Sequence, residues 1–310
     1  MTGQAAVGRG GAPVVAVANQ KGGVGKTTTA VNLAASLAAT NRQVLLIDLD
    51  PQGNATMGCG VEKDALDAGI YEVLLEGAAI AEARIDAESA GFDVVGANVD
   101  LSGAELELID VPEREFRLRQ AIDVVREDYD FVLIDCPPSL SLLTLNGLTA
   151  ASGVIIPMQC EYYALEGLTS LVGTIRRIGE GLNPELSIQG IVRTMYDPRN
   201  SLTKDVSEQL ITHFGDLVYN TKVPRNVRLA EAPSFGLPIL YYDKQSRGAR
   251  AYLALAGEVI RRESARAPSG SDNKPGAGGE SENNSRRGSE HGEESRPGGR
   301  GSEEEKTDGV

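Results

Sequence analysis

A glycine-rich run with two lysines is the part of this sequence best suited to chemistry. Residues 20–28 are Gln-Lys-Gly-Gly-Val-Gly-Lys-Thr-Thr. An apolar stretch, Val14 to Ala18, precedes the run, and a helical pattern from Thr28 to about Ala39 follows it. The glycines therefore lie where a strand turns into a helix, which is the setting of a loop that binds phosphate groups.

Each residue type in the run suits one part of a nucleotide. The glycines let the backbone approach phosphate oxygens, and the N–H groups of the turn and of the first helical residues point at the anion. Lys26 is expected to reach the β- and γ-phosphates, and the Thr27 hydroxyl to ligate Mg²⁺. The residues expected to touch the nucleotide here are Gly22, Gly23, Gly25, Lys26, Thr27 and Thr28.

The run departs from the general P-loop pattern, G-x-x-x-x-G-K-[ST], at its first position. Gln20 replaces the first glycine, and a second lysine, Lys21, follows it. The alternative for the whole run is a glycine-rich turn without a ligand, which the coincidence of strand, turn, Lys-Thr pair and helix disfavours. The alternative for Lys21 is a solvated loop cation.

Two further apolar runs end in carboxylates. Asp48 and Asp50 follow residues 44–47, and Asp135 follows residues 131–134. Ligands of parallel sheets bind beyond the carboxyl ends of the strands, so these ends and the glycine-rich loop are expected to converge. Asp135 has the Walker B position, where a carboxylate holds Mg²⁺ through its water shell, and Asp48 is a candidate second outer-sphere ligand. Asp50 is placed to orient a water that attacks the γ-phosphate; the alternative for each carboxylate is an N-cap or a turn.

Short apolar runs alternate with helical patterns along the chain. This alternation predicts an α/β fold with a mostly parallel, twisted sheet and helices on both faces. Several runs are continuously hydrophobic, as expected for strands covered on both faces. The expected strands are 14–18, 43–47, 92–96, 131–134, 153–157, 187–192 and 217–219. The expected helices are 27–40, 114–128, 141–151, 164–179, 201–214 and 248–263.

The chain has 310 residues, enough for one α/β domain of about 250 residues and a tail. We expect a flexible leader at 1–12, a P-loop ATPase domain at 13–263 and a disordered tail at 264–310. The tail is Gly, Ser, Glu, Asn, Arg and Pro with almost no apolar residue, so it cannot offset its ordering entropy. The three cysteines lack C-x-x-C spacing and are expected to be buried or half-buried free thiols.

The net charge is −14, which excludes a protein that coats nucleic acid with its whole surface. Residues 191–252 are locally basic, with nine Lys and Arg against six acids, so one region could still bind phosphate backbones. No run approaches the roughly 18 apolar residues that span a bilayer, and the N-terminus lacks the pattern of a signal peptide. The sequence therefore predicts a cytoplasmic protein.

Together these features resemble the ParA/Soj type of chromosome-partitioning ATPase, in the deviant Walker A group of P-loop NTPases to which MinD also belongs. The resemblance spans about residues 14–262. The matching segments are 19–33 (NQKGGVGKTTTAVNL), 48–54 (DLDPQGN), 135–139 (DCPPS), 159–167 (QCEYYALEG) and 224–234 (PRNVRLAEAPS). The last two segments are typical of the chromosomal partitioning branch.

The resemblance implies ATP and Mg²⁺ as cofactors and a cycle of dimerisation. ATP joins two subunits face to face, and Lys21 reaches across to the partner's nucleotide, so Lys21, Lys26 and Asp50 become the catalytic residues. Pro224 and Asn226 match the segment that surrounds the adenine base. The ATP-bound homodimer binds non-specific double-stranded DNA of the nucleoid, and a ParB-type protein bound at centromere-like sites stimulates hydrolysis and release.

The resemblance also implies that arginines in the second half face DNA. Arg199 and Arg228 are the positions at which such proteins present arginines to the phosphate backbone, and Arg247 is a further candidate of the same type. The alternative for Arg199 and Arg228 is a solvated surface, or an ion pair with Asp197 or Glu231.

Three other functions share parts of this signature. A MinD-like ATPase that cycles on membranes ends in a basic amphipathic helix, whereas anionic lipid would repel residues 301–310, GSEEEKTDGV. A cluster-carrying relative needs paired cysteines at the dimer face, and Cys59 and Cys160 show no pairing with Cys136. A relative that positions another cargo shares the whole ATPase core, and the residues leave this alternative open.

Overall fold

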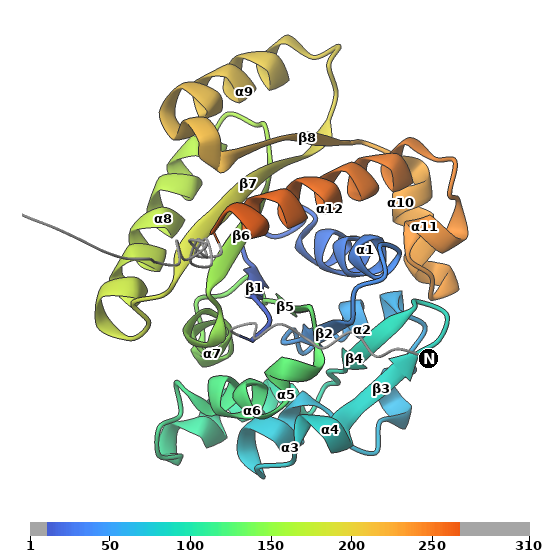
Figure 1. Cartoon of the computed structure of the whole chain (residues 1–310). Coiled ribbons are helices and arrows are strands. Elements are labelled where there is room, and N and C mark those ends of the chain that lie inside the picture. Colours follow the sequence, from blue (N-terminus) through green and yellow to red (C-terminus); the bar gives the residue numbers. More distant parts are fainter. Residues whose placement is uncertain (1–10, 267–310) are drawn as a thin grey trace, which may run out of the picture. The chain divides into compact units, whose positions relative to one another are not determined.

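The computed structural model describes residues 11–266, which form an eight-stranded sheet (Figure 1). The strand order is β3-β4-β2-β5-β1-β6-β7-β8. The strands are β1 Val14–Val17, β2 Val44–Asp48, β3 Arg84–Ala87, β4 Phe92–Val95, β5 Phe131–Asp135, β6 Gly153–Gln159, β7 Ser187–Tyr196 and β8 Val218–Pro224. Every neighbouring pair is parallel except β3 and β4, which are antiparallel.

Six helices connect or follow the main strands, and shorter ones lie in the connections. The longer helices are α1 Lys26–Ala38, α6 Arg117–Val125, α7 Leu142–Ala150, α8 Ala164–Gly181, α9 Ser201–Phe214 and α12 Arg247–Arg266. The shorter ones are α2 Asn54–Gly58, α3 Ile70–Leu75, α4 Ile80–Ala83, α5 Leu101–Glu107, α10 Val227–Glu231 and α11 Ile239–Tyr242. Single 3-10 turns lie at Lys63–Ala65, Leu108–Asp110, Arg126–Asp128, Gly215–Leu217 and Ala232–Phe235.

The sheet separates two hydrophobic cores. In β1, Val14 and Ala16 pack into one core while Val15 and Val17 pack into the other, because successive side chains of a strand point to opposite faces. Helices α3, α5, α6, α7 and α8 contribute to the first core, and α1, α2, α11 and α12 to the second. Figure 1 shows α1 and α12 close together over one face, and they pack directly on each other. Coverage of both faces explains the continuously hydrophobic strands.

The predicted α/β fold with a mostly parallel sheet and helices on both faces is confirmed, with corrections in detail. Strands β7 and β8 are longer than expected, and β3 was not expected at all. Helix α12 extends to Arg266, so residues 264–266 belong to a helix and not to the tail in which we placed them. Residues 1–10 of the expected leader and 267–310 of the expected tail lie outside the described residues.

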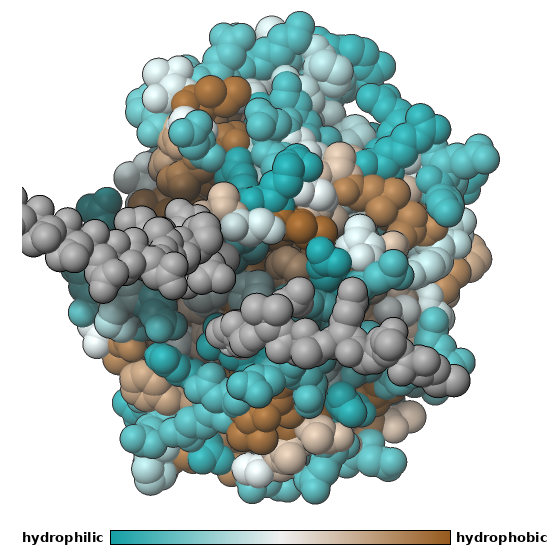
Figure 2. All heavy atoms as spheres, in the orientation of Figure 1, coloured by the Kyte–Doolittle hydropathy of each residue, from teal (hydrophilic) through white to brown (hydrophobic). Residues whose placement is uncertain are grey.

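The surface seen in Figure 2 is mostly hydrophilic, with apolar side chains gathered in separate patches. Among residues 11–266, no helix is both long and apolar enough to cross a membrane. Cys59, Cys136 and Cys160 are buried and free, as predicted.

Candidate functional site

The glycine-rich loop joins β1 to α1, as expected. Gly23 and Gly25 have φ angles of 73° and 86°, in the left-handed region where a Cβ is disfavoured. Gly25 is the N-cap residue of α1, and among residues 11–266 this helix has no side-chain hydrogen bond at its N-cap. The loop therefore leaves the N–H groups at the start of α1 free of side-chain partners, which is the requirement for an anion site at a helix N-terminus.

Lys26 is the first residue of α1 and is only 7% exposed. Its ammonium donates a long hydrogen bond, 3.5 Å, to the carbonyl of Lys21 and so spans the mouth of the loop. Burial lowers the pKa of Lys26, and the carboxylates of Asp135 and Asp50 act in the opposite direction. A buried ammonium group that makes only this long hydrogen bond within residues 11–266 is suited to binding a polyphosphate.

Asp135 is the last residue of β5, next to Val17 of β1 and Asp48 of β2 in the sheet register. It is fully buried, and within residues 11–266 neither carboxylate oxygen has a hydrogen-bond partner. Burial raises the pKa of Asp135 well above its usual range, and the charge of Asp48 raises it further. The nearby Thr27 hydroxyl lowers this pKa, although within residues 11–266 it does not have the geometry of a hydrogen bond to either carboxylate oxygen. An unpaired buried carboxylate beside a lysine is costly unless a cation or proton satisfies it.

Asp48 ends β2 and braces the segment that follows it. Its Oδ1 accepts the N–H of Asp50 at 3.0 Å, and its Oδ2 accepts both the N–H and the hydroxyl of Thr56, at 2.9 and 2.8 Å. The Thr56 hydroxyl in turn accepts the N–H of Ala97 at 2.9 Å. Burial raises the pKa of Asp48 to about 6, against these hydrogen bonds. Asp48 thus ties the end of β2 to α2 and to the segment after β4.

Asp50 is half-buried and lies in a tight turn that leads into α2. Its Oδ1 accepts the N–H of Gln52 at 3.0 Å, and its carbonyl accepts the N–H of Gly53 at 2.8 Å. Gly53 has a φ of 63°, and a Cβ there would lie 2.6 Å from the carbonyl oxygen of Ala97. The turn therefore needs glycine, and it fixes the position of Asp50 relative to Asp48.

Lys21 is exposed but not free. Its N–H donates to the Asn19 side chain at 3.0 Å, and its ammonium pairs with Glu161, just after β6, at 2.5 Å. Asn19 donates to the carbonyl of Pro157 in β6 at 2.7 Å. Lys21 is thus a half-exposed cation that pairs with Glu161 just after β6, and its role across a dimer stays a prediction.

The residues expected around adenine lie at the end of β8. Pro224 is the last residue of that strand, and Asn226 caps α10 by accepting the N–H of Leu229 at 3.3 Å. This part of the chain is linked to α1, because the side chain of Asn32 accepts the N–H of Ile239 at 2.7 Å and donates to the carbonyl of Thr28 at 2.7 Å. The adenine assignment stays a prediction.

Arg199 and Arg228 both form the ion pairs that the sequence offered as the alternative to contact with DNA. Arg199 lies 2.8 Å from Asp197, and Arg228 lies 2.9 Å from Glu231. Hydrogen bonds from Arg199 lower the pKa of Asp197 to about 2. Arg199 is nevertheless 88% exposed, so water screens this ion pair and the pair adds little to stability. Arg247, at the start of α12, is exposed as well. Contacts with phosphate remain open to all three.

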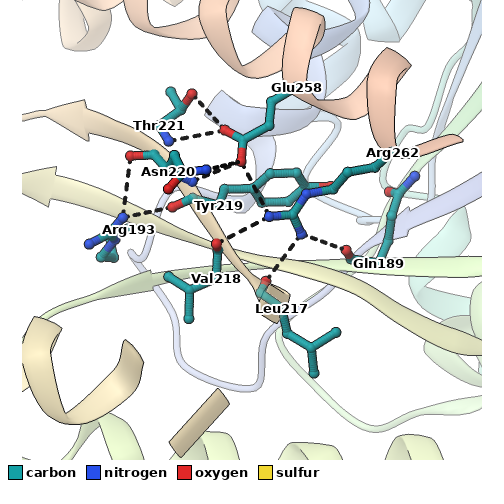
Figure 3. A network of polar contacts seen from close by, with 9 residues as sticks. All are labelled: Gln189, Arg193, Leu217, Val218, Tyr219, Asn220, Thr221, Glu258 and Arg262. Carbon is teal, nitrogen blue, oxygen red and sulfur yellow. Dashed lines mark hydrogen bonds and ion pairs between the residues drawn. The ribbon is translucent and has the colours of Figure 1, made fainter. Parts of the chain in front are cut away.

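One arginine of the locally basic region is structural. Arg193 is 2% exposed and donates to Ser207 of α9 at 2.9 Å and to the Tyr219 carbonyl at 2.7 Å. It belongs to the network of Figure 3, which ties β7 and β8 to α12 through a buried carboxylate, Glu258. The guanidinium of Arg262 stacks 4.0 Å from the Tyr219 ring in the same network. Arg193 therefore does not add to a surface for nucleic acid, although it is one of the nine basic residues of the region 191–252.

Comparison with known proteins places this geometry in a family. A family model described as an AAA domain matches residues 12–188. The chromosome partitioning protein ParA of Caulobacter vibrioides is 54% identical over 252 residues, which cover 81% of this chain and 94% of that protein. The chain belongs to the ParA/Soj family of chromosome-partitioning ATPases.

Two further relatives agree in extent. The sporulation initiation inhibitor protein Soj of Bacillus subtilis is 51% identical over 246 residues, covering 79% of this chain and 97% of that protein. The structure of cobyrinic acid a,c-diamide synthase from Mycobacterium smegmatis, solved with an ATP analogue and magnesium, is 38% identical. It has a TM-score of 0.72 and covers 82% of this chain and 97% of that one. Each of these similarities thus covers about four fifths of this chain.

Several residues of the site were not assigned roles from the sequence. Thr56 braces Asp48, Glu161 pairs with Lys21, and Asn32 connects α1 to α11. Thr194 of β7 donates to the carbonyl of Val24 in the glycine-rich loop at 2.7 Å. Asn32 and Glu161 lie in segments that the sequence singled out, 19–33 and 159–167, whereas Thr56 and Thr194 lie outside all of them.

Proposed function

We propose that this protein is an ATP hydrolase that partitions DNA as an ATP-dependent homodimer. The observation that carries the proposal is the buried, unpaired carboxylate of Asp135 beside Lys26 at the start of α1. Membership of the ParA/Soj family and the ATP analogue bound by the M. smegmatis relative support the same nucleotide.

The residues present fit Mg²⁺. Both buried oxygens of Asp135 lack a hydrogen-bond partner in the described part of the chain, and the Thr27 hydroxyl lies nearby at the start of α1. No group of three or more His, Cys, Asp or Glu side chains suited to a metal occurs within residues 11–266, in keeping with a cation held chiefly by Thr27, phosphate oxygens and water. When bound, Mg²⁺ neutralises charge that develops on the phosphate oxygens. Asp135 would hold its water shell, and Asp48 would add an outer-sphere charge.

The chain's own residues then divide the work on ATP. The backbone of Gly22, Gly23 and Gly25 cradles the phosphates, and Lys26 faces the β- and γ-phosphates. Asp50, braced through its N–H by Asp48, orients the attacking water and accepts its proton. Thr28 lies in the first turn of the same helix, and Pro224 and Asn226 enclose the adenine at the end of β8.

Lys21 is the residue that would join the two subunits. In this protomer its ammonium is paired with Glu161 at the surface, beside the loop that binds phosphate. We infer that in the dimer Lys21 exchanges this contact for the partner's nucleotide. ATP would then bridge the subunits, and hydrolysis would separate them.

DNA binding is assigned to three exposed arginines: Arg199 in the loop after β7, Arg228 in α10 and Arg247 at the start of α12. Their charges would contact phosphates and not base edges, so binding is expected to be independent of sequence and to place the cytoplasmic protein on the nucleoid. A ParB-type centromere-binding protein is the proposed partner that stimulates hydrolysis.

The test is the ATPase rate of the full chain, alone and with duplex DNA, a ParB-type protein, or both. For a partitioning ATPase we expect the rate to be highest when both are present. Stimulation that does not depend on DNA would instead favour a relative that positions another cargo. Absence of Mg²⁺-dependent hydrolysis in every mixture would contradict the proposal.

A further inference from the structure

A buried threonine of β7 supports the phosphate loop from the side of the sheet. The Thr194 hydroxyl donates a 2.7 Å hydrogen bond to the carbonyl of Val24, and the two residues are only 3% and 1% exposed. A Cβ built on Gly25 would lie 3.8 Å from the Thr194 side chain. The contact joins residues 170 positions apart in the sequence, so a shift of the loop backbone would displace Thr194 in β7 directly.

The strand is irregular immediately after Thr194. Met195 has a φ of 48°, in the left-handed region that a residue with a Cβ rarely adopts. The register between β7 and β8 also shifts between Arg193 and Tyr196, as it does at a β-bulge. Bulges and strained residues of this kind re-aim side chains and are concentrated at functional and switching segments.

The two sides of the irregularity differ in how firmly they are held. Before it, Arg193 is fixed by hydrogen bonds to Ser207 and to the carbonyls of Tyr219 and Asn220, as Figure 3 shows for the β8 contacts. After it, Met195 accepts a hydrogen bond from Gln159 and the Lys222 ammonium lies over the Tyr196 ring; the chain then reaches the surface, where Arg199 pairs with its neighbour Asp197. Arg193 is buried whereas Arg199 is 88% exposed, so a displacement that begins at Thr194 meets less resistance toward Arg199 than back along β7.

We propose that Thr194 is a positioning residue that couples the phosphate loop to the surface loop after β7, which carries Arg199. Nucleotide phosphates fix the Gly22–Gly25 backbone, Thr194 follows through its bond to Val24, and Met195 takes up the change between the anchored and the surface parts of β7. The inference rests on the proposed function, in which Arg199 contacts DNA. Coupling of this kind is reciprocal: nucleotide strengthens DNA binding, and DNA strengthens nucleotide binding by the same factor.

The test uses Thr194→Val, which keeps the shape of the side chain and removes the hydroxyl. Thr194→Ser keeps the hydroxyl, and Thr149→Val removes another buried hydroxyl, one that donates to the Leu145 carbonyl within α7. For each full-length variant, the affinity for a non-hydrolysable ATP analogue with Mg²⁺ is measured with and without duplex DNA. The DNA affinity is measured with and without the analogue.

In the wild type, DNA should raise the analogue affinity by about 5- to 150-fold, the usual range for coupled sites. Thr194→Val should bring this ratio to within about twofold of one, while Thr194→Ser and Thr149→Val retain it. A Thr194→Val protein that binds both ligands more weakly but keeps the wild-type ratio has lost only stability, and overturns the inference. If the wild type binds no DNA with the analogue, the proposed function fails instead. Should the valine variant not fold, Thr194→Ala lacks the same hydroxyl and has the same expected ratio.

Discussion

Lys21 and Glu161 form an ion pair within one subunit, with 2.5 Å between Nζ and Oε2. The two side chains are 49% and 51% exposed, so the pair contributes at most about 1 kcal/mol. It can hold Lys21 beside the phosphate loop in the free protomer without preventing its departure. The pair therefore competes weakly with the contact that Lys21 is proposed to make across the dimer.

Lys21→Ala should abolish ATP-dependent dimerisation while leaving nucleotide binding by the protomer largely intact, because its proposed target lies in the other subunit. Glu161→Gln should preserve the dimer and lower the ATP concentration needed for it by up to about fivefold, since it removes only the competing ion pair. Light scattering with ATP and Mg²⁺ measures the dimer. Normal dimerisation of Lys21→Ala would rule out the cross-subunit role.

Lys26→Ala should lose ATP binding and every later step, because it removes the buried cation that faces the phosphates. A fall in ATP affinity on the order of a hundredfold is expected, measured by calorimetry with Mg²⁺ present. Lys204→Ala is the matched control, since Lys204 is an exposed lysine of α9. Retention of wild-type affinity by Lys26→Ala would mean that the loop holds no nucleotide phosphate.

The chain predicts some parts of this site and not others for physical reasons. Lys26 and Asp135 could be assigned because a strand end and a glycine-rich turn are local patterns. Thr56 and Thr194 could not, since Thr56 also contacts Ala97, 41 positions away, and Thr194 contacts Val24, 170 positions away, and only the assembled sheet brings these residues near. The sequence also does not show whether a carboxylate such as Asp135 has hydrogen-bond partners, because that depends on its neighbours in the fold.

The same distinction applies to the fold. Continuous apolar runs identified the central strands, because helices bury both of their faces. The edge strand β3 was not predicted, since it has only four residues, two of them charged and exposed. Its place depends on pairing with β4, which local sequence does not specify. Strands β7 and β8 exceed their apolar segments because polar residues such as Arg193 and Thr194 are buried by partners elsewhere.

Asp50→Ala should separate ATP binding from hydrolysis. It removes the carboxylate that orients water but keeps Lys26, Thr27 and Asp135, so an ATP-bound dimer should accumulate on DNA with hydrolysis reduced by about a hundredfold or more. Asp64→Ala, an exposed carboxylate in the nearby 3-10 turn, is the control. If Asp50→Ala stays monomeric with ATP and Mg²⁺, Asp50 serves nucleotide binding and not water positioning.

Gly190 tests the packing that supports β7. A Cβ at this position would lie 2.4 Å from the Tyr219 ring, which is fully buried. Gly190→Ala should therefore lower the free energy of unfolding by about 1–3 kcal/mol. Gly173→Ala is the contrast: no atom of residues 11–266 lies within 4 Å of its Cβ position in α8, and the change should raise stability by about 0.5–1 kcal/mol. Urea unfolding compares the two, and equal effects would refute the role of the Tyr219 contact.

The DNA face is tested by the double variant Arg199→Glu and Arg228→Glu. ATP-dependent DNA binding should weaken on the order of tenfold or more while ATP-dependent dimerisation is kept, because these arginines lie outside the phosphate loop. The dependence of log affinity on log salt should become shallower by about 0.9 for each DNA phosphate that the variant no longer neutralises. Arg176→Glu with Arg261→Glu changes the net charge equally from exposed positions on α8 and α12, and separates direct contact from overall charge. Equally weakened binding in the two double variants, or wild-type affinity and salt slope in the first, would remove Arg199 and Arg228 from the DNA surface.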